Sequence, residues 1–249
     1  MRQILSAVSF LTILPLFRNF RFTDEEIGKS MRWFPLVGLM LGLVAYGFSL
    51  LTGLIPLKPE ITAFIILFFL TIATGALHCD GFADMIDGFL GGKDKEDIIR
   101  IMKESQIGAF GTIGLIFLFL GKFLAITLLL ETNAILWLVF IVAWSRWGVV
   151  YLNVLSSYAK ETGIGVIYEK QNSVWDVIIG GIIATGASVF FCGWFAIGIP
   201  VLLIGLLHGI KSYSENKING VTGDVYGFSI ELSELVLLFL AAVITTLAH

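Results

Sequence analysis

Charged residues are scarce in this sequence. Asp, Glu, Lys and Arg make up 14 % of its 249 residues, whereas soluble proteins average about 25 %. Hydrophobic residues make up 57 % of the chain, and the mean hydropathy is +0.92. This balance argues against an ordinary soluble domain. The net charge of −3 and the lack of a basic arm give no sign of a nucleic-acid partner.

Cysteine and histidine are also rare. The two cysteines, Cys79 and Cys192, have no neighbour at a metal-ligand spacing, so we expect them to pack as small hydrophobic residues. Of the three histidines, only His78 borders a polar motif. We expect His78 to be a capping or interface residue first, and a catalytic base second.

Long apolar runs fill most of the chain, and several have the roughly 20 residues that a helix needs to cross a bilayer. They predict an all-α, polytopic integral membrane protein with about seven transmembrane helices. No soluble domain is evident, so residues 1–249 are expected to form a single membrane-embedded unit. The expected spans are 34–55, 61–77, 107–130, 134–154, 174–193, 195–210 and 230–248.

The N-terminal segment differs from the later spans. Residues 1–17 are apolar but lack a good signal-peptide cleavage site, so we expect a retained interfacial or re-entrant helix. Further along, Thr23 and Glu26 have the spacing of a capping box. They predict a short surface helix before the first span.

Lys and Arg set the expected orientation. The alternation of spans places the segments 1–33, 78–106, 155–173 and 211–229 on one side of the membrane, and these hold 13 of the 16 basic residues. Because basic residues favour the cytoplasmic side, we expect these four segments to face the cytoplasm.

The segment 77–111 has the densest chemistry, and reads LHCDGFADMIDGFLGGKDKEDIIRIMKESQIGAFG. Its acids Asp80, Asp84 and Asp87 fall within an arc of roughly 60° on a helix, so they share one face. Three carboxylates on one face repel each other unless a cation lies among them. Mg²⁺, which prefers oxygen ligands, is the expected metal.

Basic residues follow these acids. Arg100 and Lys103 are three residues apart, directly before a glycine-containing stretch. They are candidate phosphate ligands, since Arg can hold phosphate through two parallel hydrogen bonds. For Lys93 and Lys95 the preference of basic residues for the cytoplasmic side is a sufficient explanation.

A second polar cluster precedes and enters the last span, and the residues that carry it are Asp224, Glu231 and Glu234. A carboxylate inside a membrane helix costs about 2–3 kcal/mol, so it usually faces a polar site. Asp224 and Glu234 are candidate catalytic or metal-binding residues, together with Asp87. Arg146, within the fourth span, is a candidate substrate ligand, and a structural Arg146–Glu234 pair is the alternative.

Two acidic clusters on one side of the membrane, with basic groups nearby, favour Mg²⁺-dependent phosphoryl or nucleotidyl transfer. A related alternative is a CDP-alcohol phosphotransferase-like lipid enzyme, although Gly91-Gly92 stands where that family's pattern requires Ala-Arg. A cation-coupled transporter is a third hypothesis. The position of the acids in loops rather than at mid-membrane argues against it.

The sequence resembles the cobalamin synthase family, the adenosylcobinamide-GDP ribazoletransferases, over nearly its whole length. The matching motifs are FLTILPLF, GALHCDGFADMIDGFLGG, RIMKESQIGAFG and GDVYGFSIELSE. The resemblance implies that adenosylcobinamide-GDP and α-ribazole, or its 5′-phosphate, combine to give adenosylcobalamin, or its 5′-phosphate, and GMP. It also implies Mg²⁺ dependence and a prokaryotic inner-membrane location.

The resemblance assigns the metal motif to Asp80, Asp84 and Asp87, and the later acidic positions to Asp224 and Glu234. The active-site loops would be 78–106 and 211–229, and His78 would bind substrate. In that family Asp and Arg are more common where this chain has Glu104 and Gln106. This difference shifts the expected phosphate contacts to Arg100 and Lys103. The expected partners are these small molecules and the bilayer, and the oligomeric state is left open.

Overall fold

The computed structural model describes residues 1–14, 20–55, 57–192 and 198–247. These residues form α-helices and one short 3₁₀ helix, and no strand occurs among them beyond a single isolated bridge between Tyr158 and Val221. The elements are α1 (Arg2–Leu11), α2 (Asp24–Gly28), η2 (Met31–Trp33), α3 (Phe34–Gly53), α4 (Pro59–Ala73), α5 (Leu77–Gly91), α6 (Lys95–Ile101), α7 (Ala109–Glu131), α8 (Trp137–Leu155), α9 (Ile164–Gln171), α10 (Val174–Cys192), α11 (Gly198–Ile218) and α12 (Gly223–Leu247).

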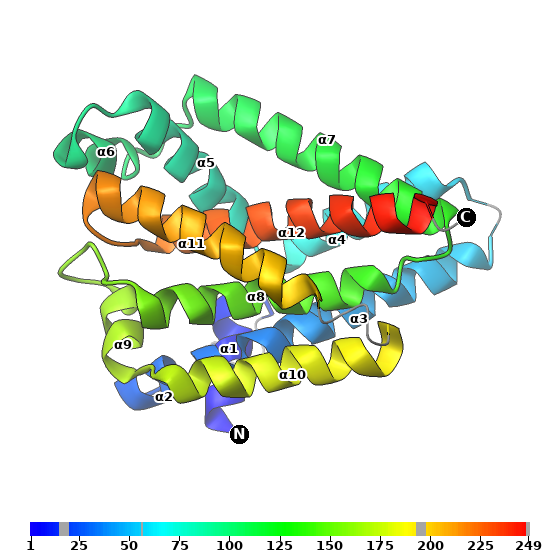
Figure 1. Ribbon diagram of the computed structural model, residues 1–249, viewed down its shortest axis with the longest axis horizontal. Coiled ribbons are helices and arrows are strands. Elements are labelled where there is room, and N and C mark those ends of the chain that lie inside the picture. The colour runs from blue at the N-terminus through cyan, green and yellow to red at the C-terminus, as the bar shows by residue number, and fades with distance from the viewer. Residues whose placement is uncertain (15–19, 56, 193–197, 248–249) are drawn as a thin grey trace.

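The long helices lie side by side in a bundle, with α8 and α12 at its centre (Figure 1). Helix α8 is buried along nearly all of its length, since α3, α10 and α12 pack around it. Helices α3, α4 and α7 expose large apolar side chains on their outer faces. An apolar exterior around a packed interior is the arrangement of an all-α membrane protein, as the sequence predicted.

The described residues support four or five of the expected spans. Among the described residues, four helical segments are long and apolar enough to cross a membrane, and the bent pair α4–α5 adds a fifth if it is counted as one broken span. The four match the expected spans at 34–55, 107–130, 134–154 and 230–248. Helices α10 and α11 occur where two more spans were expected, and the apolar stretch 174–186 of α10 is too short to count by itself. The C-terminal half of α11 is polar, which explains why α11 is not among the four.

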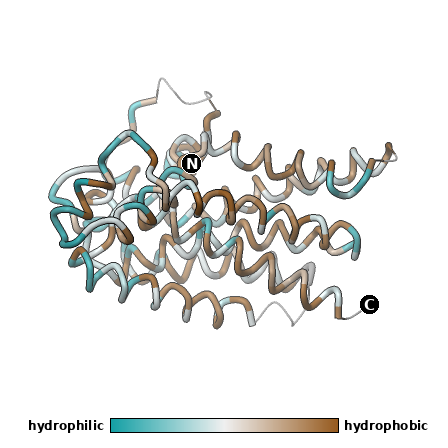
Figure 2. The backbone as a smooth tube through the Cα atoms, turned by 90° about the horizontal axis from the view of Figure 1, so that it is seen from above, coloured by the Kyte–Doolittle hydropathy of each residue, from teal (hydrophilic) through white to brown (hydrophobic). Residues whose placement is uncertain are grey.

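Polar elements gather at one end of the bundle. Figure 1 shows α2, α6, α9 and the turn between α11 and α12 at the same end, and Figure 2 shows that hydrophilic residues are concentrated there. This arrangement confirms that the four basic segments share one side.

The N-terminal elements are two short helices, α1 and α2. Helix α1 has 10 residues, which at 1.5 Å per residue is too short to cross a bilayer. Residues 15–17 of the expected interfacial segment lie outside the described residues. Thr23 and Glu26 form the predicted capping box at the start of α2.

Candidate active site

Helix α5 carries the first acidic cluster, and a break in the backbone sets its direction. Gly75 and Ala76 have positive φ angles of 61° and 55°, which end α4 and turn the chain by 85° into α5. Helix α5 therefore runs toward the polar end (Figure 1). Along it, Asp80 is exposed, Asp84 is half-buried and Asp87 is buried.

A close contact between two helices brings the second acidic cluster to the first. A Cβ atom added to Gly81 would lie 3.0 Å from the Asp224 Cα atom, and one added to Gly227 would lie 3.0 Å from the His78 carbonyl oxygen. Glycine permits this approach because it has no side chain. Asp224, in the first turn of α12, is thus held near α5, and the Asp84 carboxylate interacts electrostatically with Asp80 and Asp224.

Asp224 also has a cationic partner. Lys160 Nζ lies 3.2 Å from an Asp224 carboxylate oxygen, and the Thr222 hydroxyl donates to the same oxygen at 3.1 Å. The loop that carries Lys160 is fixed by two backbone hydrogen bonds to Val221. The loop after α8 therefore adds a positive charge to the acidic cluster.

Asp87 has a different environment from the other two acids of its helix. One carboxylate oxygen accepts a hydrogen bond from the Gly108 amide at 2.7 Å, and the other accepts one from the Gly111 amide at 2.8 Å. These amides belong to the start of α7, where unpaired N–H groups and the helix dipole favour an anion. Asp87 thus caps α7 and joins it to α5.

Two cavities meet at Asp80. The first has a volume of about 220 Å³, is mostly apolar, and is lined by residues of α1, α3, α5, α8, α9 and α12, including Asp80 and Asp224. The second shares Asp80 with the first, has a volume of about 640 Å³, and is lined by Asp80, Asp84 and Lys103, among others. Groups bound in the two cavities would meet near the Asp80 carboxylate.

His78 lines the first cavity and is 4 % exposed. Within the described part of the chain, neither of its ring nitrogens has a hydrogen-bond partner. His78 is therefore not a capping residue, but it does lie at a helix interface, the contact of α5 with α12. Buried polar atoms without a partner are uncommon and need an explanation.

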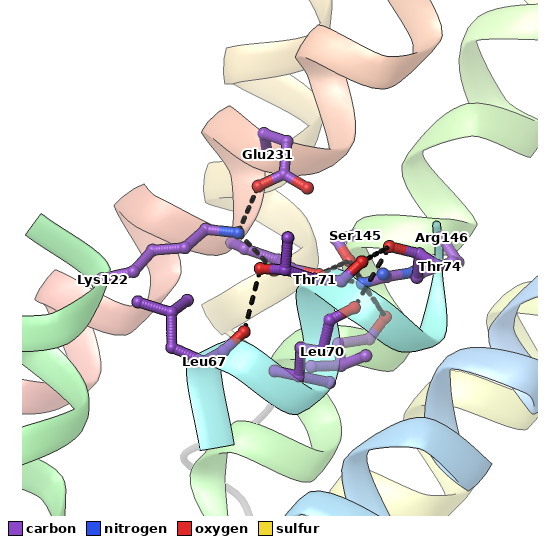
Figure 3. Close-up of polar contacts among 10 residues, drawn as sticks. Leu67, Leu70, Thr71, Thr74, Lys122, Ser145, Arg146 and Glu231 are labelled. Atoms are coloured by element: carbon purple, nitrogen blue, oxygen red, sulfur yellow. Dashed lines mark hydrogen bonds and ion pairs between the residues drawn. The ribbon is translucent and has the colours of Figure 1, made fainter. Parts of the chain in front are cut away.

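Glu234 and Arg146 belong to a buried ion network that lines neither of the two cavities at Asp80, although Arg146 interacts electrostatically with His78. Arg146 donates to one oxygen of Glu234, and Lys122 Nζ lies 2.6 Å from the other. Lys122 also lies 2.5 Å from Glu231 (Figure 3). Two cations thus balance two anions in the interior. The structural Arg146–Glu234 pair is confirmed.

This network lines a small cavity of its own, which neither Asp80 nor Asp224 lines. The structure therefore does not bring the candidate catalytic residue Glu234, or the candidate substrate ligand Arg146, to the acidic cluster.

The two candidate phosphate ligands after α5 are placed differently. Arg100 is exposed and pairs with Asp97 and Glu104 on its own side of α6. The hydrogen bond from Arg100 holds the pKa of Asp97 below its usual value. Lys103, by contrast, lines the larger cavity together with Asp80 and Asp84.

The acidic cluster can be compared with the needs of Mg²⁺. Among the described residues, no three Asp, Glu, His or Cys side chains are already arranged to hold a metal ion. Mg²⁺ usually takes only one or two carboxylates and completes its shell with water and substrate phosphates. Asp80, Asp84 and Asp224 meet that smaller requirement, whereas both oxygens of Asp87 are engaged.

Comparison with known proteins identifies the family. A model of the cobalamin-5-phosphate synthase family matches residues 3–242. The chain belongs to the cobalamin-5-phosphate synthase family. Among its relatives, the adenosylcobinamide-GDP ribazoletransferase of Prosthecochloris aestuarii is 36 % identical over 216 residues, which cover 84 % of this chain and 86 % of the relative. That of Geotalea daltonii is 32 % identical over 248 residues, 96 % of each chain. No solved structure matches the chain.

In this member of the cobalamin-5-phosphate synthase family, the sequence did not point to several residues that line the first cavity or pair with Asp224. Lys160 gave no signal beyond its place in a polar segment. Tyr158 and Tyr168 line the first cavity but have no motif around them. Lys122, which belongs to the buried ion network and not to this site, did give a signal, because a lysine inside an expected span needs an anionic partner.

Proposed function

We propose that this protein joins adenosylcobinamide-GDP and α-ribazole, or α-ribazole 5′-phosphate; its relatives' names give adenosylcobinamide-GDP and ribazole as their substrates. The observation that carries the proposal is the meeting of Asp80, Asp84 and Asp224 between two cavities at the polar end of the bundle. A transfer between two substrates requires such a meeting point. The family match gives no support to a lipid phosphotransferase or a transporter.

In the proposed reaction, a ribose hydroxyl of α-ribazole attacks the phosphorus atom that is bonded to cobinamide. A new P–O bond forms to the ribose oxygen, the P–O bond to GMP breaks, and the hydroxyl proton is released. The products are adenosylcobalamin, or its 5′-phosphate, and GMP. The attack is direct, without a covalent enzyme intermediate.

The acidic cluster supplies the base in this proposal. Asp224 lines the mouth of the smaller cavity and is accessible at 23 % of its side-chain surface. A carboxylate within reach of the attacking hydroxyl can accept its proton. Glu234 is less suited to this role because Lys122, Arg146 and Ser145 surround its carboxylate.

The diphosphate would be held by cations. Lys103 lines the larger cavity with Asp80 and Asp84, and Lys160 pairs with Asp224, so each could contact phosphate oxygens beside the acidic cluster. Asp80 and Asp84 would hold Mg²⁺, which leaves Asp224 as the base. When bound, this ion would neutralise charge on the phosphates.

The polar end of the bundle would face the cytoplasm of a prokaryotic cell, with the bundle in the inner membrane. The support is the accumulation of 13 of 16 basic residues in the four segments at that end.

The test is GMP release by the purified protein in detergent. The assay contains adenosylcobinamide-GDP, α-ribazole and Mg²⁺, and each is omitted in turn. We expect GMP and a corrinoid product in equal amounts, and only when all three are present. Folded protein that releases no GMP from the complete mixture would refute the assignment of these substrates.

A further inference from the structure

The smaller cavity has walls suited to a flat apolar ring. Phe10, Phe34 and Tyr168 form a cluster of aromatic rings along it. The Phe10 and Phe34 rings stack at 5.7 Å, and Tyr168 meets each of them edge-on at 5.6 and 5.9 Å. Such rings bind another aromatic ring by stacking and edge-to-face contact.

The volume of this cavity limits its occupant. Pockets that hold whole drug-sized ligands measure about 300–1,000 Å³, whereas this one has about 220 Å³. A corrinoid or an entire nucleotide is too large for it. One bicyclic aromatic base is of the appropriate size, with its sugar at the mouth beside Asp80 and Asp224.

The polar groups of the cavity favour one kind of base. His78 and the Tyr168 hydroxyl are its buried polar groups without a partner among the described residues. A neutral imidazole has one N–H donor, and the ribazole base is a methylated bicyclic ring with one free ring nitrogen that can accept. Guanine suits the cavity less well, because its several donors and acceptors would lie against apolar walls unpaired.

We propose that the cavity lined by Phe10, Phe34, His78 and Tyr168 is the acceptor-base subsite, in which His78 donates a hydrogen bond to the free ring nitrogen of the ribazole base. The nucleotide-bearing donor then occupies the larger cavity beside Lys103. This inference rests on the proposed function and deepens it. It also gives α1 a role, since Phe10 and Leu11 complete the wall.

The first test fills the cavity. Ile164 on α9 lines it and is 41 % exposed, so a larger side chain can be accommodated without repacking a core. We expect Ile164→Trp to raise the KM for α-ribazole at least tenfold and to leave the KM for adenosylcobinamide-GDP within twofold. The matched control is Ile178→Trp on α10, a site 43 % exposed that lines neither cavity at Asp80. It should change neither constant.

The second test removes the hydrogen bond. An α-ribazole analogue has C–H in place of the free ring nitrogen, and the wild type should use it about tenfold less efficiently in kcat/KM. In His78→Leu this ratio should fall to near one. A wild type that does not discriminate, or a His78→Leu protein that discriminates as well as the wild type, would overturn the role of His78.

The outcomes separate this inference from the proposed function. If the wild type turns over but Ile164→Trp raises only the KM of the donor, or neither KM, the base lies elsewhere and only the inference fails. If the wild type does not turn over, the proposed function fails. Equilibrium binding of α-ribazole to the wild type and to Ile164→Trp then still tests the cavity, and equal affinity would overturn the inference.

Discussion

Asp87 and Asp84 lie on the same helix, but we expect Asp87 to stabilise the fold and Asp84 to take part in the reaction. Substituting each residue in turn tests this difference. Its carboxylate accepts the Gly108 and Gly111 amide hydrogens, and the residue is 8 % exposed. Hydrogen bonds to a charged group contribute about 1.5–3 kcal/mol each. In Asp87→Asn an NH₂ group replaces one carboxylate oxygen and the negative charge is lost. The new side-chain N–H group then faces a backbone N–H group, and neither can accept the other's hydrogen. We expect the free energy of unfolding to fall by roughly 2–3 kcal/mol.

For a chain of this length that loss lowers the melting temperature by on the order of 5–10 °C, measured by thermal unfolding in detergent. Asp84→Asn is the matched control, because Asp84 is on the same helix and its charge is opposed by Asp80 and Asp224. It should keep the melting temperature and lose GMP release. If Asp87→Asn melts within about 1 °C of the wild type yet releases no GMP, the capping argument is refuted.

Three further predictions concern packing, charge and metal. Gly227→Ala puts a Cβ atom 3.0 Å from the His78 carbonyl oxygen, so it should destabilise the fold by about 1–3 kcal/mol and reduce turnover. Gly209→Ala, which meets no atom within 4 Å, should do neither. Lys122→Met should destabilise the fold by about 3–5 kcal/mol in thermal unfolding, and Lys122→Met with Glu231→Gln should regain part of this. Chelation should abolish GMP release, and added Mg²⁺ should restore it; persistent release without metal would contradict the Mg²⁺ proposal.

Local features could be predicted from the sequence alone. The capping box of Thr23 and Glu26 involves residues three apart, so its geometry follows from helix formation. The spans at α7, α8 and α12 follow from continuous apolar runs. The sharing of one end by the polar segments follows from the alternation of spans.

Features that depend on tertiary contacts could not be predicted. Asp87 lies on the same helix as Asp80 and Asp84, but its role is decided by amides 21 and 24 residues away. Likewise, Lys122 meets Glu231 across 109 residues. The sequence shows that such charges need partners, whereas only the packing of α7 against α12 shows which partners they have.

The break between α4 and α5 is an intermediate case. The apolar run suggested one span over 61–77, but positive φ angles at Gly75 and Ala76 end the helix inside it. A glycine in an apolar run is compatible with either a continuous or a broken helix. The turn matters for function because it directs α5 and its carboxylates to α12.

The most direct test of the central claim is GMP release by Asp80→Asn, Asp224→Asn and Glu234→Gln, with melting temperatures measured in parallel. The account predicts that the first two lose turnover by about 10²–10⁴-fold at unchanged melting temperature, because their carboxylates lie between the two cavities. Glu234→Gln should instead melt at a lower temperature, because it leaves buried cations uncompensated. Near-normal turnover in Asp80→Asn and Asp224→Asn, with a stable but inactive Glu234→Gln, would contradict it.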